Sequence, residues 1–434
     1  MRITALKSLI AGMFAVAAAS ASAAPDGDIT YTVKPADTLY GLTGQYLVNA
    51  SALNEVRRIN RVRNPRLMQI GRTLRIPRRL LKYRPVDLTL QSFSGTVRLS
   101  RRNRAITPSI GLAIREGLEI TTGRNSFVSI AGTGNSRVSI PSNSRARIVD
   151  ARRYLINDQI DIQLRVLKGR GEVVAPKIDG QGRYRMGTPL AVTAVRGTDF
   201  RVAYEPEGEI SLTEVVEGEV QVAAGSKDIT TAAGFGVASA GDMLGENEEL
   251  LPAPMFIEPG QIQTAETVSF ALEPLTGASA FRTQIATDAG FVDVIADVIS
   301  DTKEVDFGAL EDGRYNIRSR AVSEDGLEGL FTRVESFRRK RVGVAAAAEP
   351  APFEDALKFA WRAEGSGDST HAFQLWLSDK PGELLVDEVG LTNSAVLISS
   401  LDPGTYKWRV ATFQIDEGDV IKVWGPTQEL NVSE

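Results

Sequence analysis

The sequence has 434 residues, of which 43% are hydrophobic, and its formal net charge is −4. It contains no cysteine and a single histidine, His371. These counts exclude disulfide bonds, thiol catalysis and cysteine-ligated metals, and they leave almost no room for histidine-based catalysis or the usual zinc sites. A chain of this length has room for three to four domains of about 100–150 residues each.

The N-terminus has the features of an export signal. Two basic residues, Arg2 and Lys7, precede an apolar run from Ser8 to Ala19, and Ala21-Ser22-Ala23 places small residues at the spacing that signal peptidases cleave. We therefore expect residues 1–23 to be a cleaved signal peptide and the mature protein to reside in the periplasm or cell envelope. The alternative is an uncleaved membrane anchor, but the apolar run is short. No later stretch reaches the ~18 apolar residues of a spanning helix, so we expect no transmembrane span after cleavage.

Residues 31–77 predict a small domain with the order strand, helix, helix, strand. Apolar and polar residues alternate in Tyr31–Val33 and in Leu74–Ile76, which is typical of short strands. The segment between them contains two amphipathic stretches, and we expect them to be helices capped by Thr38 and Ser51.

This order of elements resembles the LysM domain, a small module that binds N-acetylglucosamine-containing glycans, chiefly peptidoglycan. The resemblance rests on Tyr31-Thr-Val33, Asp37-Thr38-Leu39, Asn60, and the ending Gly71…Leu74-Arg-Ile76-Pro77. We assign residues 30–78 to a LysM domain. Two features depart from the family's pattern. Ala36 stands where a glycine usually precedes the aspartate. Gly41 and Gly44 lie inside the first helix and cost about 1 kcal/mol each relative to alanine, so we expect that helix to be short.

The resemblance implies a sugar groove between the loop after the first strand and the loop before the last one. The glycan-binding residues predicted in this way are Asp37, Thr38, Leu39, Tyr40, Pro65, Leu67, Met68 and Ile70. Leu39, Leu67 and Ile70 could instead be core residues. Tyr40 and Met68 are the stronger candidates for contact with the glycan.

Charge is distributed unevenly along the chain. The segment Arg57–Arg104 contains fourteen arginines and one lysine against one acid, Asp87, whereas residues 241–434 contain 34 acids against 16 bases. A basic head predicts contact with something anionic, and outside the cytoplasm peptidoglycan stem peptides, lipopolysaccharide and teichoic acids qualify. Nucleic acid would fit the charge, but the export signal argues against it. A solvated arginine-rich surface without a ligand is the alternative.

From about residue 85 the pattern changes to short strands separated by Gly, Asn, Pro or Ser, about 8 to 12 residues apart. This spacing predicts an all-β sandwich, barrel or solenoid. Within this stretch, Gly117–Gly123, Thr188–Val202 and Glu217–Val222 resemble the FecR domain, most specifically in Ala194-Val-Arg-Gly-Thr-Asp-Phe200. We assign residues 85–247 to a FecR-like β domain.

The motif at the centre of that resemblance predicts a turn. Gly197 would permit a backbone bend that a side chain would obstruct, and Arg196 and Asp199 are near enough in sequence to hold the bend by a charged hydrogen bond. The family's best-known members sense iron-citrate uptake in the periplasm and signal to a cytoplasmic sigma factor. We find neither the membrane span nor the cytoplasmic regulator segment that this role needs, so we do not carry the signalling role over.

The C-terminal part of the sequence contains a repeat. Leu310–Arg318 aligns with Leu401–Arg409 at an offset of 91 residues, with the shared pattern Leu-x-x-Gly-x-Tyr-x-(Ile/Trp)-Arg. A repeat of this length, made of short strands, has the size of an immunoglobulin-like sandwich. The pattern resembles fibronectin type III-like domains, in which the tyrosine packs inward and its hydroxyl fixes a corner. We assign residues 251–341 and 350–434 to two such modules, with a hinge at Arg338–Arg341 and Ala345–Pro352.

No catalytic constellation emerges from the sequence, and we predict neither an enzyme, nor a metal site, nor a cofactor. The expected protein is multidomain and mainly β, and it binds peptidoglycan through its LysM domain. The FecR-like and Ig-like domains would be available for a protein or ligand partner whose identity remains open. One alternative is a sensory component that acts through a separate membrane partner. Another is an accessory module of a cell-wall hydrolase system.

Overall fold

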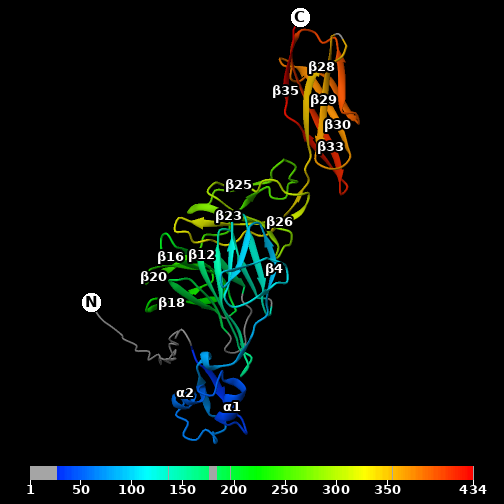
Figure 1. Ribbon diagram of the computed structural model, residues 1–434. Coiled ribbons are helices and arrows are strands. Elements are labelled where there is room, and N and C mark those ends of the chain that lie inside the picture. The colour runs from blue at the N-terminus through cyan, green and yellow to red at the C-terminus, as the bar shows by residue number, and fades with distance from the viewer. Residues whose placement is uncertain (1–26, 135, 175–182, 196, 354, 434) are drawn as a thin grey trace, which may run out of the picture. The chain divides into compact units, whose positions relative to one another are not determined.

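The computed structural model describes residues 27–134, 136–174, 183–195, 197–353 and 355–433 (Figure 1). The predicted signal peptide and Arg196 lie outside these ranges. The chain forms two compact units, Met1–Arg84 with Tyr154–Gln159, and Pro85–Arg153 with Ile160–Glu434. The two α-helices of the described chain have eight residues each, so neither has the length of about 20 residues that a bilayer requires.

The first unit has the predicted order of elements. Strand β1 (Ile29–Thr32) pairs antiparallel with β2 (Thr73–Ile76), and between them lie α1 (Leu39–Tyr46) and α2 (Ala52–Ile59). A short 3-10 helix, η1 (Arg78–Leu80), and strand β3 (Tyr83–Pro85) follow. The domain core is therefore a two-stranded sheet covered by two short helices.

The two predicted helix caps have different outcomes. The Thr38 hydroxyl accepts a hydrogen bond from the Gly41 amide at 2.9 Å, as a capping threonine should. Ser51 makes no capping bond, so that expectation is wrong. The side chain of Asn49 accepts the Ala52 amide at 3.0 Å instead, and the Ser51 hydroxyl donates to Asn49. The preceding turn thus brings an earlier residue to the helix start.

The core of this unit includes residues far along the chain. Tyr154 and Ile156 are 1% and 8% exposed and pack with the apolar side chains of β1, β2 and both helices. The Arg78 guanidinium lies 5.4 Å from the centre of the Tyr154 ring, and the Leu155 amide donates to the Lys82 carbonyl at 3.1 Å. The unit therefore extends beyond the predicted residues 30–78.

In the described residues, the FecR-like part of the second unit consists of two β-sheets that share the long strand β12, and β3 also pairs with β11. Pairing gives one sheet the order β6-β5-β8-β11-β12-β13-β14-β17-β18 and the other the order β7-β4-β9-β10-β12-β15-β16-β19-β20. The strands are β4 (Leu88–Ser94), β5 (Val97–Arg101), β6 (Arg104–Ile106), β7 (Ala113–Ile114), β8 (Leu118–Thr122), β9 (Phe127–Ala131), β10 (Arg137–Ile140), β11 (Arg145–Tyr154), β12 (Ile160–Val174), β13 (Arg183–Gly187), β14 (Ala191–Val195), β15 (Asp199–Glu205), β16 (Ile210–Glu217), β17 (Glu219–Ala224), β18 (Lys227–Ala232), β19 (Phe235–Ala240) and β20 (Met243–Glu249).

Apolar residues from both sheets form one core, so the mainly β fold that was predicted for this region is confirmed. From β13 on, the chain alternates between the sheets in pairs of strands. Gly197, at the predicted bend, has a φ of +72°, a conformation that side chains disfavour. The predicted hydrogen bond between Arg196 and Asp199 involves a residue, Arg196, that lies outside the described ranges.

Each C-terminal repeat is a sandwich of two sheets. The first module has sheets β21-β22-β25 and β24-β23-β26-β27, and the second has β28-β29-β32 and β31-β30-β33-β34, with β35 also paired to β33. The strands are β21 (Phe256–Ile257), β22 (Ser269–Leu272), β23 (Ala278–Ala286), β24 (Val294–Ser300), β25 (Glu304–Asp306), β26 (Gly313–Ser323), β27 (Glu335–Arg339), β28 (Gly343–Pro350), β29 (Ala356–Glu364), β30 (Ser369–Leu377), β31 (Leu384–Leu391), β32 (Ala395–Ser399), β33 (Gly404–Asp416), β34 (Asp419–Trp424) and β35 (Gln428–Val432).

The repeated tyrosine makes the same bond in both modules. The Tyr315 hydroxyl donates to the Glu311 carbonyl at 3.0 Å, and the Tyr406 hydroxyl donates to the Asp402 carbonyl at 2.7 Å. Both acceptors lie four residues upstream, at the corner before β26 and β33. The predicted corner role of the two tyrosines is therefore confirmed.

The hinge predicted between the modules is wrong. Gly343–Pro350 forms strand β28 and pairs with β29 along its whole length, so the second module begins before residue 350. Arg338 and Arg339 end strand β27, and Arg338 forms ion pairs with Asp416, Glu417 and Asp419. The alanine run lacks the alternation of apolar and polar residues that indicates a half-buried strand. Its backbone nevertheless pairs with β29 in a sheet.

Candidate functional site

The two loops predicted to form the sugar groove are joined by a backbone hydrogen bond. The amide of Leu39, the first residue of α1, donates to the Pro65 carbonyl at 2.8 Å. Farther along, the Gly71 amide donates to the Val33 carbonyl at 2.9 Å. These bonds hold the loop before α1 beside the loop before β2, so the structure brings the predicted residues of both loops together.

The polar residues of the first loop fix its shape. The Asp37 carboxylate accepts hydrogen bonds from the Lys34 amide at 2.7 Å and from the Tyr31 hydroxyl at 2.8 Å. Burial and the bond to Asp37 raise the pKa of Tyr31 to about 12, so the phenol remains a donor at neutral pH. Thr38 caps α1. Asp37 and Thr38 therefore hold the backbone of this loop in place.

The apolar residues divide into core and surface, and not as the sequence suggested. Leu39 is 1% exposed and belongs to the core, whereas Tyr40, Leu67 and Ile70 are 53%, 76% and 63% exposed. Met68 is partly buried and packs against the core. The core alternative is thus wrong for Leu67 and Ile70 and right for Leu39. Loop segments have no apolar period, so sequence alone could not separate these side chains.

Ala36, the residue that departs from the family's glycine, adopts a left-handed backbone with φ +69°. This conformation costs a residue with a side chain roughly 1 kcal/mol or more relative to glycine. The loop before Asp37 therefore keeps the shape that a glycine would allow, at some cost in stability.

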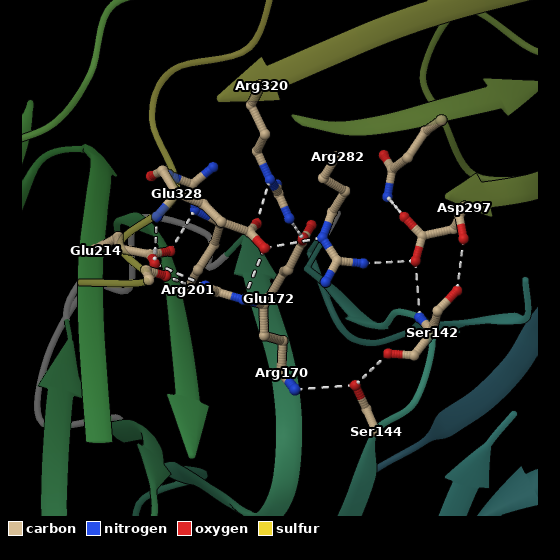
Figure 2. Close-up of polar contacts among 12 residues, drawn as sticks. Ser142, Ser144, Arg170, Glu172, Arg201, Glu214, Arg282, Asp297, Arg320 and Glu328 are labelled. Atoms are coloured by element: carbon tan, nitrogen blue, oxygen red, sulfur yellow. Dashed lines mark hydrogen bonds and ion pairs between the residues drawn. The ribbon is translucent and has the colours of Figure 1, made fainter. Parts of the chain in front are cut away.

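A second polar site, absent from the sequence prediction, lies within the second unit. It joins the FecR-like sheet to the first C-terminal module (Figure 2). Glu172, Arg201 and Glu214 lie side by side in register across β12, β15 and β16. Glu328, in the chain between β26 and β27, forms ion pairs with Arg170 of β12 and with Arg282 and Arg320 of the module.

Further hydrogen bonds extend this contact. Asp297 of β24 accepts the Ser142 amide at 2.8 Å and pairs with Arg282 at 2.7 Å, as Figure 2 shows. Arg201 donates to the carbonyls of Glu328 and Gly329. Two apolar clusters complete the contact, one around Phe127 and Phe291 and the other around Leu212 and Leu327.

The charges in this contact perturb one another's pKa values. Burial alone would raise the pKa of Glu172, but the neighbouring Arg320, Arg318 and Arg201 outweigh burial and lower it to about 2. Burial and the Glu172 carboxylate raise the pKa of Asp199 to about 6. Glu172 is therefore an anion at all physiological pH values, whereas Asp199 titrates near neutrality.

Metal ligation and the single histidine would be further sources of chemistry in the described residues. Within the described ranges, no group of three or more His, Asp or Glu side chains is placed to hold a metal ion. His371 is 6% exposed and lies against the Trp361 ring and the Thr412 hydroxyl, and burial lowers its pKa. It is a core residue of the second C-terminal module.

Comparisons with known proteins match parts of the chain. Residues 31–77 match the model of the LysM domain, and residues 119–221 match the model described as FecR protein. No curated protein matches the sequence.

Solved structures are similar over longer stretches. A protein from Parabacteroides distasonis assigned as an anti-sigma factor shares 16% identity, with a TM-score of 0.25, over 30% of this chain and 58% of its own, which is less than two thirds of its length. Fibronectin(III)-like modules of Clostridium thermocellum CbhA share 12% identity, with a TM-score of 0.21, over 42% of this chain and 94% of theirs. A two-domain fibronectin type III segment of chicken tenascin shares 13% identity, with a TM-score of 0.21, over 42% of this chain and all of its own.

The family models match the two regions for which the sequence predicted those domains. The first C-terminal module is a sandwich of a three-stranded and a four-stranded sheet, and the second is a sandwich of a three-stranded and a five-stranded sheet. The chain thus contains a region that matches the LysM domain and a region that matches the FecR protein, followed by two β-sandwich modules.

Proposed function

We propose that this protein is a non-enzymatic component of the bacterial cell envelope that binds peptidoglycan through its LysM domain. The observation that carries the proposal is the exposure of three apolar side chains beside the bond that joins the two loops, namely Tyr40 in the first turn of α1, and Leu67 and Ile70 in the loop before β2. Aromatic and aliphatic surfaces stack on the apolar faces of sugar rings, and backbone groups of fixed loops hydrogen-bond to acetamido and hydroxyl groups. The domain types matched by the chain support a binding role.

The FecR and fibronectin type III-like domains would then present surfaces to a protein or ligand partner. A second candidate function is a sensory role that acts through a separate membrane partner, and the FecR match favours it. A neighbouring gene for a sigma factor or a sensor kinase would support the sensory role. A secretion or hydrolase operon would favour the envelope-binding role.

Co-sedimentation with purified peptidoglycan at low and high salt tests the binding proposal. The mature chain from Ala24 is the right sample, because a fragment ending at Tyr83 would lose Tyr154 and Ile156 from its core. Recognition of neutral sugars is barely screened by ions, so we expect binding to persist when the Debye length falls from about 10 Å at 0.1 M salt to about 3 Å at 1 M. Replacing Tyr40 and Leu67 together by alanine should weaken binding.

The matched control is Phe353→Ala, which removes an exposed aromatic ring outside the LysM domain. A second variant, Tyr40→Ala with Met68→Ala, tests whether the partly buried methionine contributes. Binding that disappears at high salt and is insensitive to Tyr40 and Leu67 would show an electrostatic tether in place of a glycan groove.

A further inference from the structure

The C-terminal end of α2 carries an arginine-lined hollow that the glycan groove does not use. Arg58, Arg61 and Arg63 are exposed there. The complete lining consists of Asn54, Arg57, Arg58, Arg61, Val62 and Arg63. Four guanidinium groups thus share one concave surface without a carboxylate among its lining residues.

These arginines differ in their contacts from the others in the unit. Arg75 is paired with Asp28 at 3.0 Å, and Arg79 is paired with Glu55, the single acidic residue of α2. Within the described part of the chain, no ion pair involves the four arginines of the hollow. Of the four, Arg58 is near enough to Glu55 to contribute to lowering the pKa of that carboxyl, and the mutual repulsion of the group is compensated in part.

Arg57 is held in place by the loop that follows the helix. Its Nε donates to the Val62 carbonyl at 3.1 Å, and its Nη2 donates to the Arg63 carbonyl at 3.3 Å. These bonds orient one guanidinium group before any ligand arrives, which lowers the entropy that binding has to overcome. Arg57 therefore forms a fixed part of the wall of the hollow.

Backbone strain at Arg61 is the second, independent observation. The Val62 amide donates to the Arg57 carbonyl at 3.0 Å, and the Arg61 amide donates to the Arg58 carbonyl at 3.2 Å. This pair of bonds is a Schellman motif, whose left-handed position is usually glycine or asparagine. Here it is Arg61, with φ +51°. A helix C-terminus attracts cations, which accounts for Arg57 and Arg58. It does not account for an arginine at the strained position.

We propose that this hollow binds a phosphate monoester, carried by a lipid headgroup or by a soluble phosphorylated sugar. A monoester phosphate is close to a dianion at neutral pH and offers three terminal oxygens. Several guanidinium groups can donate to these oxygens at once, each through two parallel N–H groups. A lone carboxylate would satisfy one or two arginines and leave the others in mutual repulsion. The site is independent of the glycan groove and of the proposed wall binding.

The test uses the mature full chain and phosphatidylcholine vesicles that contain phosphatidic acid, whose headgroup is a phosphate monoester. Vesicles with phosphatidylglycerol, adjusted to the same surface potential, present a diester. We expect tighter binding to the monoester vesicles and displacement by free glycerol phosphate. Arg58→Gln, Arg61→Gln and Arg63→Gln should each weaken binding by about fivefold. Direct titration with glucosamine 6-phosphate in the absence of vesicles distinguishes a soluble source from a lipid source.

Two variants separate binding from folding. Arg61→Gly relieves the strain and removes one charge, so it should raise the thermal stability of the LysM unit while weakening phosphate binding. Ala36→Gly relieves similar strain in the same unit without changing charge, so it should raise stability and leave phosphate binding unchanged.

A control matched in both charge and backbone strain comes from the β5–β6 hairpin, where Arg101, Arg102 and Arg104 are also exposed, line a hollow of their own, and include a left-handed residue, Arg102, with φ +50°. Changing these three to glutamine removes as much charge as the triple variant of Arg58, Arg61 and Arg63. Equal losses in the two triple variants, or equal binding to monoester and diester vesicles, would show diffuse attraction and overturn the proposal. Peptidoglycan co-sedimentation should be unaffected by either triple variant, so failure of this site and failure of the glycan groove can be told apart.

Discussion

The two C-terminal β-sandwich modules share a strand order, apart from the additional β35 of the second, but they use one sheet face differently. In both, a glutamine and an arginine face each other across the central strands, Gln284 with Arg318 and Gln374 with Arg409. In both, the arginine donates to the glutamine and lies over aromatic rings, Phe291 and Phe331 in the first module and Trp376 and Trp424 in the second.

The modules differ at the positions two residues away from this glutamine–arginine pair on each strand. The first module has Arg282 opposite Arg320, and the second has Ala372 opposite Ala411. Two arginines directly opposite each other repel in a free sheet. The first pair is compensated by Glu328 and Asp297 of its own module and by Glu172 of the FecR-like sheet. The shared fold thus accounts for the glutamine–arginine pair on this sheet face. Contact with the neighbouring domain accounts for the charged residues at the positions that differ.

Removing the central carboxylate of the first module should have the largest effect. Glu328→Ala leaves Arg170, Arg282 and Arg320 buried with too few anions, and breaking a buried ion pair in this way costs about 3–5 kcal/mol. Chemical denaturation should show this loss in the free energy of unfolding of the second unit. The control in the second module is Glu417→Ala, which removes an exposed partner of Arg314 and Arg338 and should change stability little. Equal effects from the two variants would contradict the contrast between the modules.

The pH dependence of stability should come from the charged contact of the first module. The raised pKa of Asp199, about 6, means that the folded state favours the protonated carboxyl. Its stabilising contribution is complete below the ordinary aspartate pKa of about 4 and is lost as pH rises through about 6. Glu172, whose pKa in the folded state is about 2, adds a slope of the opposite sign, which lies mainly below the ordinary glutamate pKa of about 4.3.

We therefore expect Asp199→Asn to flatten the fall in the free energy of unfolding between about pH 4 and pH 6, as measured by denaturant titration at several pH values. A slope that persists in Asp199→Asn would assign the effect to another group. Burial also raises the pKa of Asp150, so Asp150→Asn provides the second test.

The corner tyrosines allow a matched comparison with a smaller effect. Tyr315→Phe and Tyr406→Phe each delete one hydrogen bond to a backbone carbonyl, and each should cost about 1 kcal/mol in its own module. Tyr406 is 2% exposed, and Tyr315 is more accessible. The loss should therefore be the larger one at Tyr406. Thermal denaturation that follows each module separately would check the order, and the reverse order would show that burial does not set the strength of the corner bond.

The smallest effect concerns the segment between the modules. Because Gly343–Pro350 is a paired strand of the second module, brief proteolysis of the native protein should not cleave near Ala345. Mass spectrometry of the first fragments checks this expectation. Rapid cleavage at Ala345 would restore the hinge and mean that the strand opens in solution.

Sequence patterns could predict the structural features that depend on interactions between residues close together in the chain. The order of elements in the LysM domain, the cap at Thr38, the bend at Gly197 and the corner roles of Tyr315 and Tyr406 all follow from local motifs. For the proposed glycan site, sequence reasoning chose two loops that the structure brings together. It could not distinguish buried Leu39 from exposed Leu67, because that difference depends on how the loops pack.

The buried charges were beyond prediction for a related reason. Glu172, Arg201 and Glu214 occupy alternate positions of amphipathic strands, where a charge normally faces water. A charge that faces another domain produces the same sequence pattern. The asparagine cap of α2 was missed because the turn before the helix brings Asn49 closer to the helix start than its sequence position suggests.

The contribution of Tyr154 and Ile156 to the LysM core has a consequence for how the protein is made. A LysM domain that ended at residue 78 would have mostly local contacts and could close as soon as it had been synthesised. In this chain the core is complete only after residue 156 has been synthesised, when the strands from β4 to β11 already exist. Folding of the LysM unit on the ribosome should therefore be delayed until more than seventy further residues have been synthesised. During that interval the apolar side chains that Tyr154 and Ile156 later cover remain exposed and can bind chaperones.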